Sequence, residues 1–106
     1  TEQLEYRGNI PLEYSLRLSP ADGSVLESNY LNFSWNKVNN ALEYKMTVFD
    51  LNGDMIFNKS ISDTIINLNS RIYFKFGETY LWNIVAYLPD GRFIKSAVNS
   101  FEFSTK

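Results

Sequence analysis

Hydrophobic and polar residues alternate with a period of two along most of this chain. Successive side chains of a β-strand point to opposite sides of the sheet, so this period is typical of strands with one buried face. Leu31, Phe33 and Trp35 follow it, with an asparagine or a serine between them. The longest such segment covers residues 79–88. The residues expected on its buried face are Tyr80, Trp82, Ile84 and Ala86.

Turn-forming residues separate these segments. The clearest are Asp22-Gly23, Asn52-Gly53 and Pro89-Asp90-Gly91. Asn52-Gly53 predicts a tight hairpin with a type I′ turn, because both central residues of that turn need a positive φ. No segment of ten or more residues keeps a 3.6-residue period, so little or no helix is expected. About seven short strands, with a turn signal every ~8–12 residues, predict an all-β, two-sheet antiparallel β-sandwich.

The length of 106 residues corresponds to one domain, and the hydrophobic (44%) and aromatic (16%) fractions suffice for one core. Residues 1–12 carry Gly8 and Pro11 and no clean period, so they are expected to form a linker or lead-in segment. Residues 13–106 are expected to form the sandwich. Since the chain begins at Thr1, we expect it to be a piece of a longer protein.

Charge and composition exclude several functions. The net charge is −2, and no two of the ten Lys and Arg residues are adjacent, so there is no basic surface for nucleic acid or an anionic membrane. No apolar stretch approaches the ~18–20 residues of a membrane span. The chain has no cysteine and no histidine. Thiol nucleophiles, disulfides, the commonest general base and the commonest transition-metal ligand are therefore missing.

The aspartates are expected in turns, where local backbone hydrogen bonds favour them. They are Asp22, Asp50, Asp54, Asp63 and Asp90. Asp50, Asn52 and Asp54 resemble the start of a calcium loop, but an EF-hand needs Gly at position 6 and Glu at position 12, where this chain has Met55 and Ile61. A weak cation site built partly from backbone carbonyls stays open. We predict no catalytic residues, no cofactor and no dedicated metal site, and hence no enzyme.

A set of short motifs follows in order from about Leu16 to Phe103. They are Leu18-Ser19-Pro20, Asp22-Gly23, Phe33-Ser34-Trp35, Val38, Ala41, Tyr44, Leu68, Gly77 and Tyr80-Leu81-Trp82. In this order they resemble the fibronectin type III-like domains, which are immunoglobulin-like sandwiches. The resemblance implies that Trp35 anchors the core. It also implies that the Tyr80 hydroxyl caps a corner, with Leu68 as its upstream partner.

The Tyr-x-Trp pattern of Tyr80 and Trp82 is similar to modules of bacterial exported and surface proteins, many of which accompany polysaccharide-processing machinery. This resemblance implies an extracytoplasmic location. The function expected from it is a non-catalytic interaction or spacer module of a larger protein, with neighbouring domains and a protein as partners. The alternative is a carbohydrate-binding module that contacts a polysaccharide through exposed aromatic side chains.

Aromatic and apolar residues exceed what one core requires. Val85 and Tyr87 lie on the expected outer face of segment 79–88, and Phe49 is expected beside them on a neighbouring strand. Tyr73 and Phe76 lie in the connection of residues 71–77, where apolar side chains have no automatic partner. These five residues are the candidate ligand or partner surface, because aromatic side chains stack on sugar rings and form interface cores.

Two structural alternatives compete with this hypothesis. In the first, the strand residues are cross-strand pairs that stabilise an exposed sheet by ~0.2–1 kcal/mol each, while Tyr73 and Phe76 close the end of the sandwich. In the second, the lead-in segment covers part of the outer face with Tyr6 and Ile10.

Overall fold

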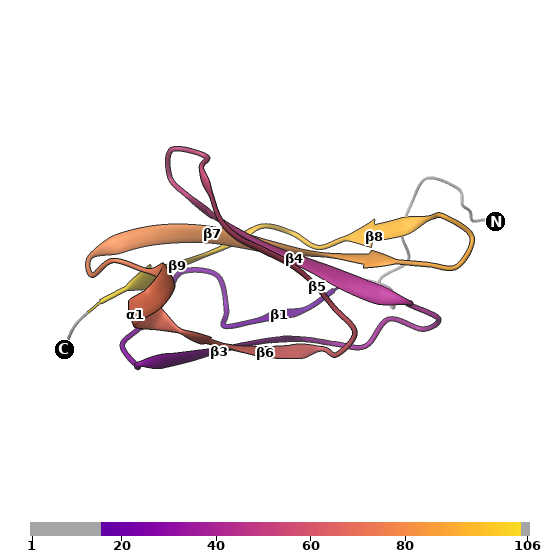
Figure 1. Cartoon of the computed structure of the whole chain (residues 1–106), viewed down its shortest axis with the longest axis horizontal. Helices are drawn as coiled ribbons and strands as arrows, with labels where there is room; N and C mark the ends of the chain where they lie inside the picture. The colour runs from indigo at the N-terminus through magenta and orange to yellow at the C-terminus, as the bar shows by residue number, and fades with distance from the viewer. Residues whose placement is uncertain (1–15, 105–106) are drawn as a thin grey trace.

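A computed structural model describes residues 16–104. Two sheets face each other and enclose one core (Figure 1). The strands are β1 (Leu18–Ser19), β2 (Ser24–Leu26), β3 (Tyr30–Trp35), β4 (Glu43–Asp50), β5 (Met55–Ile61), β6 (Ile65–Asn69), β7 (Glu78–Tyr87), β8 (Phe93–Lys95) and β9 (Asn99–Phe103), with one short helix, α1 (Ser70–Tyr73). The two-sheet β-sandwich with little helix is therefore confirmed.

The strand count and one pairing differ from the prediction. The described residues contain nine strands rather than about seven. The smaller sheet has the order β1-β3-β6, and the larger has β2-β9-β7-β4-β5, with β8 also paired to β7. The chain passes from the smaller to the larger sheet between β1 and β2, so these two segments form separate short strands. β2 pairs with β9 in parallel, so the larger sheet is not wholly antiparallel.

β7 is the central strand of the larger sheet. One edge of β7 pairs with every residue of β4, from Glu43↔Tyr87 to Asp50↔Tyr80. The other edge is shared by β9 along the first half and β8 along the last three residues. The predicted buried face of β7 is confirmed, because all four of its residues lie in the core. They are Tyr80, Trp82, Ile84 and Ala86.

Aromatic rings fill the centre of the sandwich. Trp82 is fully buried and meets the ring of Phe33 edge to face at 5.0 Å between centroids. Phe33 meets Phe101 in the same way at 5.4 Å. Edge-to-face pairs add about 0.5–1.5 kcal/mol each beyond the burial of their area. The implied role of Trp35 as a core residue is also confirmed, since it is 5% exposed and contacts Tyr44 at 5.8 Å.

Two tyrosine hydroxyls satisfy backbone groups beside the core. The Tyr80 hydroxyl accepts a hydrogen bond of 2.8 Å from the Lys75 N–H, and the Tyr44 hydroxyl accepts one of 2.9 Å from the Val38 N–H. The implied corner cap by Tyr80 is thus present. Its hydrogen-bond partner is Lys75, while Leu68 contributes to the same core cluster as an apolar side chain.

The β4–β5 hairpin is present, but its predicted turn type is wrong. Gly53 has a φ of +88°, whereas Asn52 is not among the described residues with positive φ. The Gly53 N–H donates to the Asp50 carbonyl (3.1 Å), and the Asp50 N–H donates to the Asp54 carbonyl (2.9 Å). This is the three-residue loop that combines a type I turn with a left-handed residue. Asp50 Oδ1 favours it by accepting from the N–H groups of Asn52 and Asp54, at 2.9 Å each.

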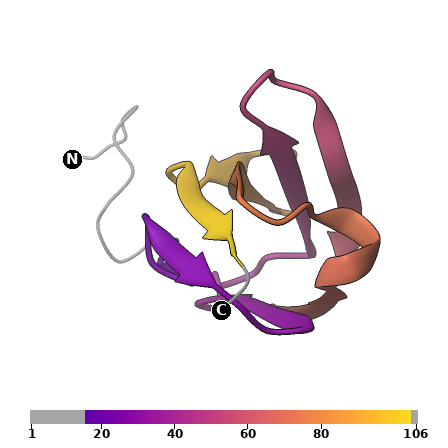
Figure 2. The same ribbon diagram turned by 90° about the vertical axis from the view of Figure 1, so that its left-hand side faces the viewer.

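α1 joins the two layers on the side of β5 and β6 (Figure 2). Asn69 caps its start by accepting from the Arg71 N–H at 3.0 Å. Ser70 is buried, and its hydroxyl donates to the carbonyls of Ser28 (2.8 Å) and Asn29 (2.9 Å). The helix is therefore fixed to the loop before β3. The lead-in segment predicted for residues 1–12, with Tyr6 and Ile10, lies outside the described residues.

Candidate binding surfaces

The five candidate residues lie in three separate places. Phe49 is on the outer face of the larger sheet near the β4–β5 hairpin, opposite Leu81 and Met55. Val85 and Tyr87 are on the same face farther along β7. Between them and Phe49 lies a row of polar side chains. The row consists of Thr47, Asn58 and Asn83, with a 3.0 Å hydrogen bond from Asn58 Nδ2 to Thr47 Oγ1.

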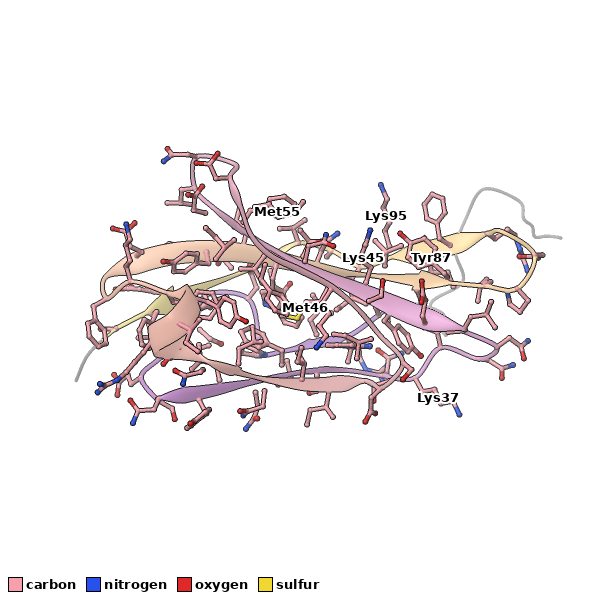
Figure 3. The ribbon with its side chains drawn as sticks, viewed as in Figure 1. Lys37, Lys45, Met46, Met55, Tyr87 and Lys95 are labelled. Carbon is pink, nitrogen blue, oxygen red and sulfur yellow. The ribbon has the colours of Figure 1, made fainter. Side chains whose placement is uncertain are left out.

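Val85 and Tyr87 belong to what we call the outer-face cluster, which consists of Lys45, Val85, Tyr87, Phe93 and Lys95. Val85 pairs with Lys45 on one side and Lys95 on the other, and Tyr87 pairs with Phe93. The Tyr87 and Phe93 rings are 6.3 Å apart, and Lys95 Nζ lies 5.8 Å from the centre of the Phe93 ring. Figure 3 shows Lys45, Tyr87 and Lys95 on the same side of the molecule.

The outer-face cluster combines aromatic rings with both signs of charge. Phe93 is 52% exposed, while Tyr87 and Val85 are half-buried. Glu43 faces Tyr87 across the β4–β7 pair and adds a carboxylate to this face, two residues before Lys45 on β4. Such a surface can make apolar and ionic contacts with another protein.

Tyr73 packs into the side of the sandwich. It is the last residue of α1 and is half-buried, with its ring edge to face against Phe57 of β5 at 5.3 Å. It also lies 6.1 Å from the Phe74 ring. The Tyr73 ring thus fills the space between α1 and β5.

Phe76 belongs to a hollow at one end of the molecule, which we call the end hollow. Its lining residues are Arg71, Phe74, Lys75, Phe76 and Phe103, and its volume is about 450 Å³. Phe76 lies nearly parallel to Phe103, with 4.9 Å between centroids and 20° between planes. Phe103 is buried, but Phe76 is 57% exposed. One face of the Phe76 ring is therefore covered by Phe103 and the other is open.

The sequence pattern indicated Phe76 but missed the rest of the end hollow. Phe103, Arg71 and Lys75 were not among the predicted site residues. The local clue was that residues 71–76 hold two cationic and three aromatic side chains. The contact with Phe103 depends on the hydrogen bond from the Gly77 N–H to the Phe103 carbonyl (2.7 Å), which joins segments far apart in the chain.

The buried hydroxyl groups have hydrogen-bond partners, whereas the Nε1–H groups of Trp35 and Trp82 are buried without one. Among the described residues, the buried polar ones are Thr47 and Ser70, and both form the hydrogen bonds given above. Asp90 has a lowered pKa, first because its carboxylate accepts from the Arg92 N–H (3.1 Å) and then because it pairs with the Arg92 side chain (2.6 Å) in an exposed turn. Within residues 16–104, no three carboxylates are grouped so as to hold a metal ion.

Comparison with known proteins identifies the fold. No protein-family model and no curated protein matches the chain. Its structure is similar to that of a Fn3-like protein from Clostridium thermocellum, with 21% identity, a TM-score of 0.56, and coverage of 81% of this chain and 91% of that one. It is also similar to the fibronectin(III)-like modules of Clostridium thermocellum CbhA, with 20% identity, a TM-score of 0.59, and coverage of 86% and 97%.

A third similar structure is CopC from Methylosinus trichosporium OB3b, with 12% identity, a TM-score of 0.59, and coverage of 86% of this chain and 93% of that one. At these identities the likeness concerns the fold alone. The fold is a fibronectin type III-like β-sandwich, as the sequence motifs implied. In the part of the chain that the structure describes, no helix has the length and apolarity to cross a membrane.

Proposed function

We propose that this chain is a non-catalytic interaction or spacer module of a larger extracytoplasmic bacterial protein, in which it positions neighbouring domains. The observation that carries the proposal is the position of the first and last described strands. β1 pairs with the end of β3 at Leu18↔Trp35, and β9 ends beside the start of β7 at Phe103↔Glu78.

These two positions are at opposite ends of the molecule. Trp35 contacts Tyr44, which pairs with Ala86 near the end of β7, whereas Glu78 begins that strand. The body is elongated, with extents of 49 × 23 × 21 Å (Figure 1). The first and last described strands therefore lie toward opposite ends of an elongated body, as a spacer requires.

Two further observations support the proposal. The buried hydroxyl groups of Thr47 and Ser70 form hydrogen bonds within the fold, which fits a module without catalytic machinery. The resemblance of Tyr80 and Trp82 to modules of bacterial exported proteins supports the location. The outer-face cluster, with its aromatic rings and lysines, is the surface that best suits a protein partner.

A fusion experiment tests the spacer role. The 106-residue chain is placed between two rigid reporter domains, and the distance distribution between them is measured by single-molecule fluorescence transfer. We expect one narrow peak, because a folded sandwich fixes the separation. A Gly/Ser linker of equal length is the control and should give a broad distribution. A distribution as broad as that of the linker would contradict the proposal, as would turnover of a substrate that a single Asp or Glu substitution abolishes.

Carbohydrate binding is the second candidate function. The observation that favours it is the open face of Phe76 in the end hollow, because a flat aromatic ring with one free face can support a sugar ring. Titration of soluble glycans, followed by amide chemical shifts, tests this candidate with the alanine variants of Tyr73, Phe76 and Tyr87. The absence of any shift with every glycan would contradict it.

A further inference from the structure

We infer that the end hollow binds an acidic sugar, namely a uronic acid unit of a polysaccharide. This inference rests on the second candidate function and assigns it a ligand class and a place. The hollow combines the two features that a uronic acid would engage, a free aromatic face and a pair of cations.

The aromatic feature is the Phe76 ring. Because Phe103 supports one side of it at 4.9 Å, the other side faces the solvent as a flat apolar surface. The face of an aromatic ring carries partial negative charge, so it attracts the C–H groups on the flat side of a pyranose ring. The volume of about 450 Å³ suits one or two sugar units, since small-ligand sites span roughly 300–1,000 Å³.

The charged feature is the pair Arg71 and Lys75. Both line the hollow, and no Asp or Glu is among its lining residues. Within residues 16–104 neither cation forms an ion pair, and Glu78, the nearest carboxylate along the chain, begins β7 outside the lining. The hollow is thus a cationic spot on a chain whose net charge is −2. A guanidinium matches a carboxylate with two parallel hydrogen bonds, so the spot favours a sugar that carries a carboxylate.

The backbone that carries these side chains is fixed before any ligand arrives. Ser70 ties the start of α1 to the loop before β3, and the Lys75 N–H is held by the Tyr80 hydroxyl. Gly77 is tied to the Phe103 carbonyl. A ligand therefore has little backbone to order on binding, which favours affinity.

The outer-face cluster meets these requirements less well. Phe93 there is nearly as exposed as Phe76, but Lys95 already lies over its ring, and Glu43 on the same face adds a negative charge. It therefore provides a matched control surface on the same chain.

The test compares two probes of equal length, a galacturonic acid trimer and a neutral galactose trimer. Each is titrated into the 106-residue chain by calorimetry and amide chemical shifts. We expect the acidic trimer to bind at least about tenfold more tightly than the neutral one, a difference that one charge-assisted contact can supply. Raising the salt concentration should weaken the binding of the acidic trimer and leave the binding of the neutral trimer nearly unchanged.

Four variants locate the site. Phe76→Ala should lower the affinity for both trimers by about tenfold or more, because both lose the stacking on the ring. Arg71→Gln and Lys75→Gln should each lower the affinity for the acidic trimer alone, by roughly three- to tenfold. Phe93→Ala is the matched control and should change neither. All four side chains are exposed, and thermal unfolding verifies that each variant folds.

The results separate the inference from the function on which it rests. Equal binding of both trimers, lost in Phe76→Ala, would overturn the acidic-sugar inference but support carbohydrate binding. Binding of neither trimer would overturn both. A loss in Phe93→Ala as large as that in Phe76→Ala would also overturn the inference, because the ligand would then lie on the outer face.

Discussion

At the scale of single residues, the Tyr80 hydroxyl accepts a hydrogen bond from the Lys75 N–H, a backbone donor that takes no part in strand pairing. Replacing Tyr80 with Phe removes the acceptor of the Lys75 N–H and leaves that part-buried donor without its partner. We expect the free energy of unfolding to fall by about 1–3 kcal/mol, the usual cost of an unsatisfied donor. Urea denaturation of the wild type and variant measures it.

Tyr87→Phe is the matched control for Tyr80→Phe. Tyr87 lies on the same strand, but its ring is on the outer face and half-buried. Its substitution should change the free energy of unfolding by less than ~0.5 kcal/mol, as for most surface changes. If both variants unfolded at the same urea concentration, the corner hydrogen bond would not contribute to stability.

The turn between β7 and β8 contains a carboxylate with a shifted titration. The Arg92 N–H and then the Arg92 side chain hold the pKa of Asp90 below its ordinary value of 3.8. A carboxyl pKa that is lowered in the folded state stabilises the fold above the unfolded pKa, and this small effect is lost as the pH falls through the folded pKa. A carbon-13 NMR titration should give a pKa below 3.8 for Asp90.

Arg92→Gln separates the two causes of this shift. It removes the cationic side chain but keeps the backbone N–H, which is the larger cause, so the pKa of Asp90 should rise only part of the way. A complete return to the ordinary value would instead assign the shift to the ion pair.

At the scale of elements, the β4–β5 hairpin depends on the backbone of Gly53. A Cβ at this position would meet no atom within 4 Å, so substitution affects the backbone alone. Gly53→Ala forces an L-residue to a φ of +88° and should lower the free energy of unfolding by about 1–2 kcal/mol. Asn52→Ala, whose backbone lacks this requirement, is the control for denaturation measurements. Equal effects in both variants would contradict the described turn.

The sequence predicted those elements whose signal is local. Period-two alternation placed β3 and β7 to within one residue at each end. In these strands one face of the sheet is buried and the other is exposed, so the polarity of each residue shows to which face its side chain points. β2 has three residues and no period, and it forms only through its parallel pairing with β9. The turn type also escaped prediction, since the Asp50 carboxylate decides it from outside the Asn52-Gly53 pair.

The candidate surfaces were predictable only as single residues. Alternation identifies Val85 and Tyr87 as outward, but it cannot pair them with Phe93 or the two lysines without the register of three strands. The end hollow is a stronger example. Phe76 acquires a free ring face only because Phe103, far along the chain, stacks beneath it. Such contacts are properties of the sheet order and not of any short motif.

At the scale of the whole molecule, both sheets share one aromatic core. Phe33 of the smaller sheet contacts Trp82 and Phe101 of the larger one, so neither sheet keeps its core if the other unfolds. We therefore expect a single cooperative transition. Tryptophan fluorescence reports on the core through Trp35 and Trp82, and far-ultraviolet circular dichroism reports on the strands. Their denaturation midpoints should coincide.

Phe33→Ala tests this coupling directly. Phe33 is fully buried, so the cavity should lower the free energy of unfolding by about 3–5 kcal/mol, a large share of the ~5–15 kcal/mol typical of a domain. Both probes should shift together, because the lost contacts join the two sheets. Phe93→Ala, an exposed position on the outer face, should shift neither by more than ~0.5 kcal/mol. If the fluorescence midpoint moved while the dichroism midpoint stayed, the sheets would unfold separately, and the sandwich could not act as one rigid spacer.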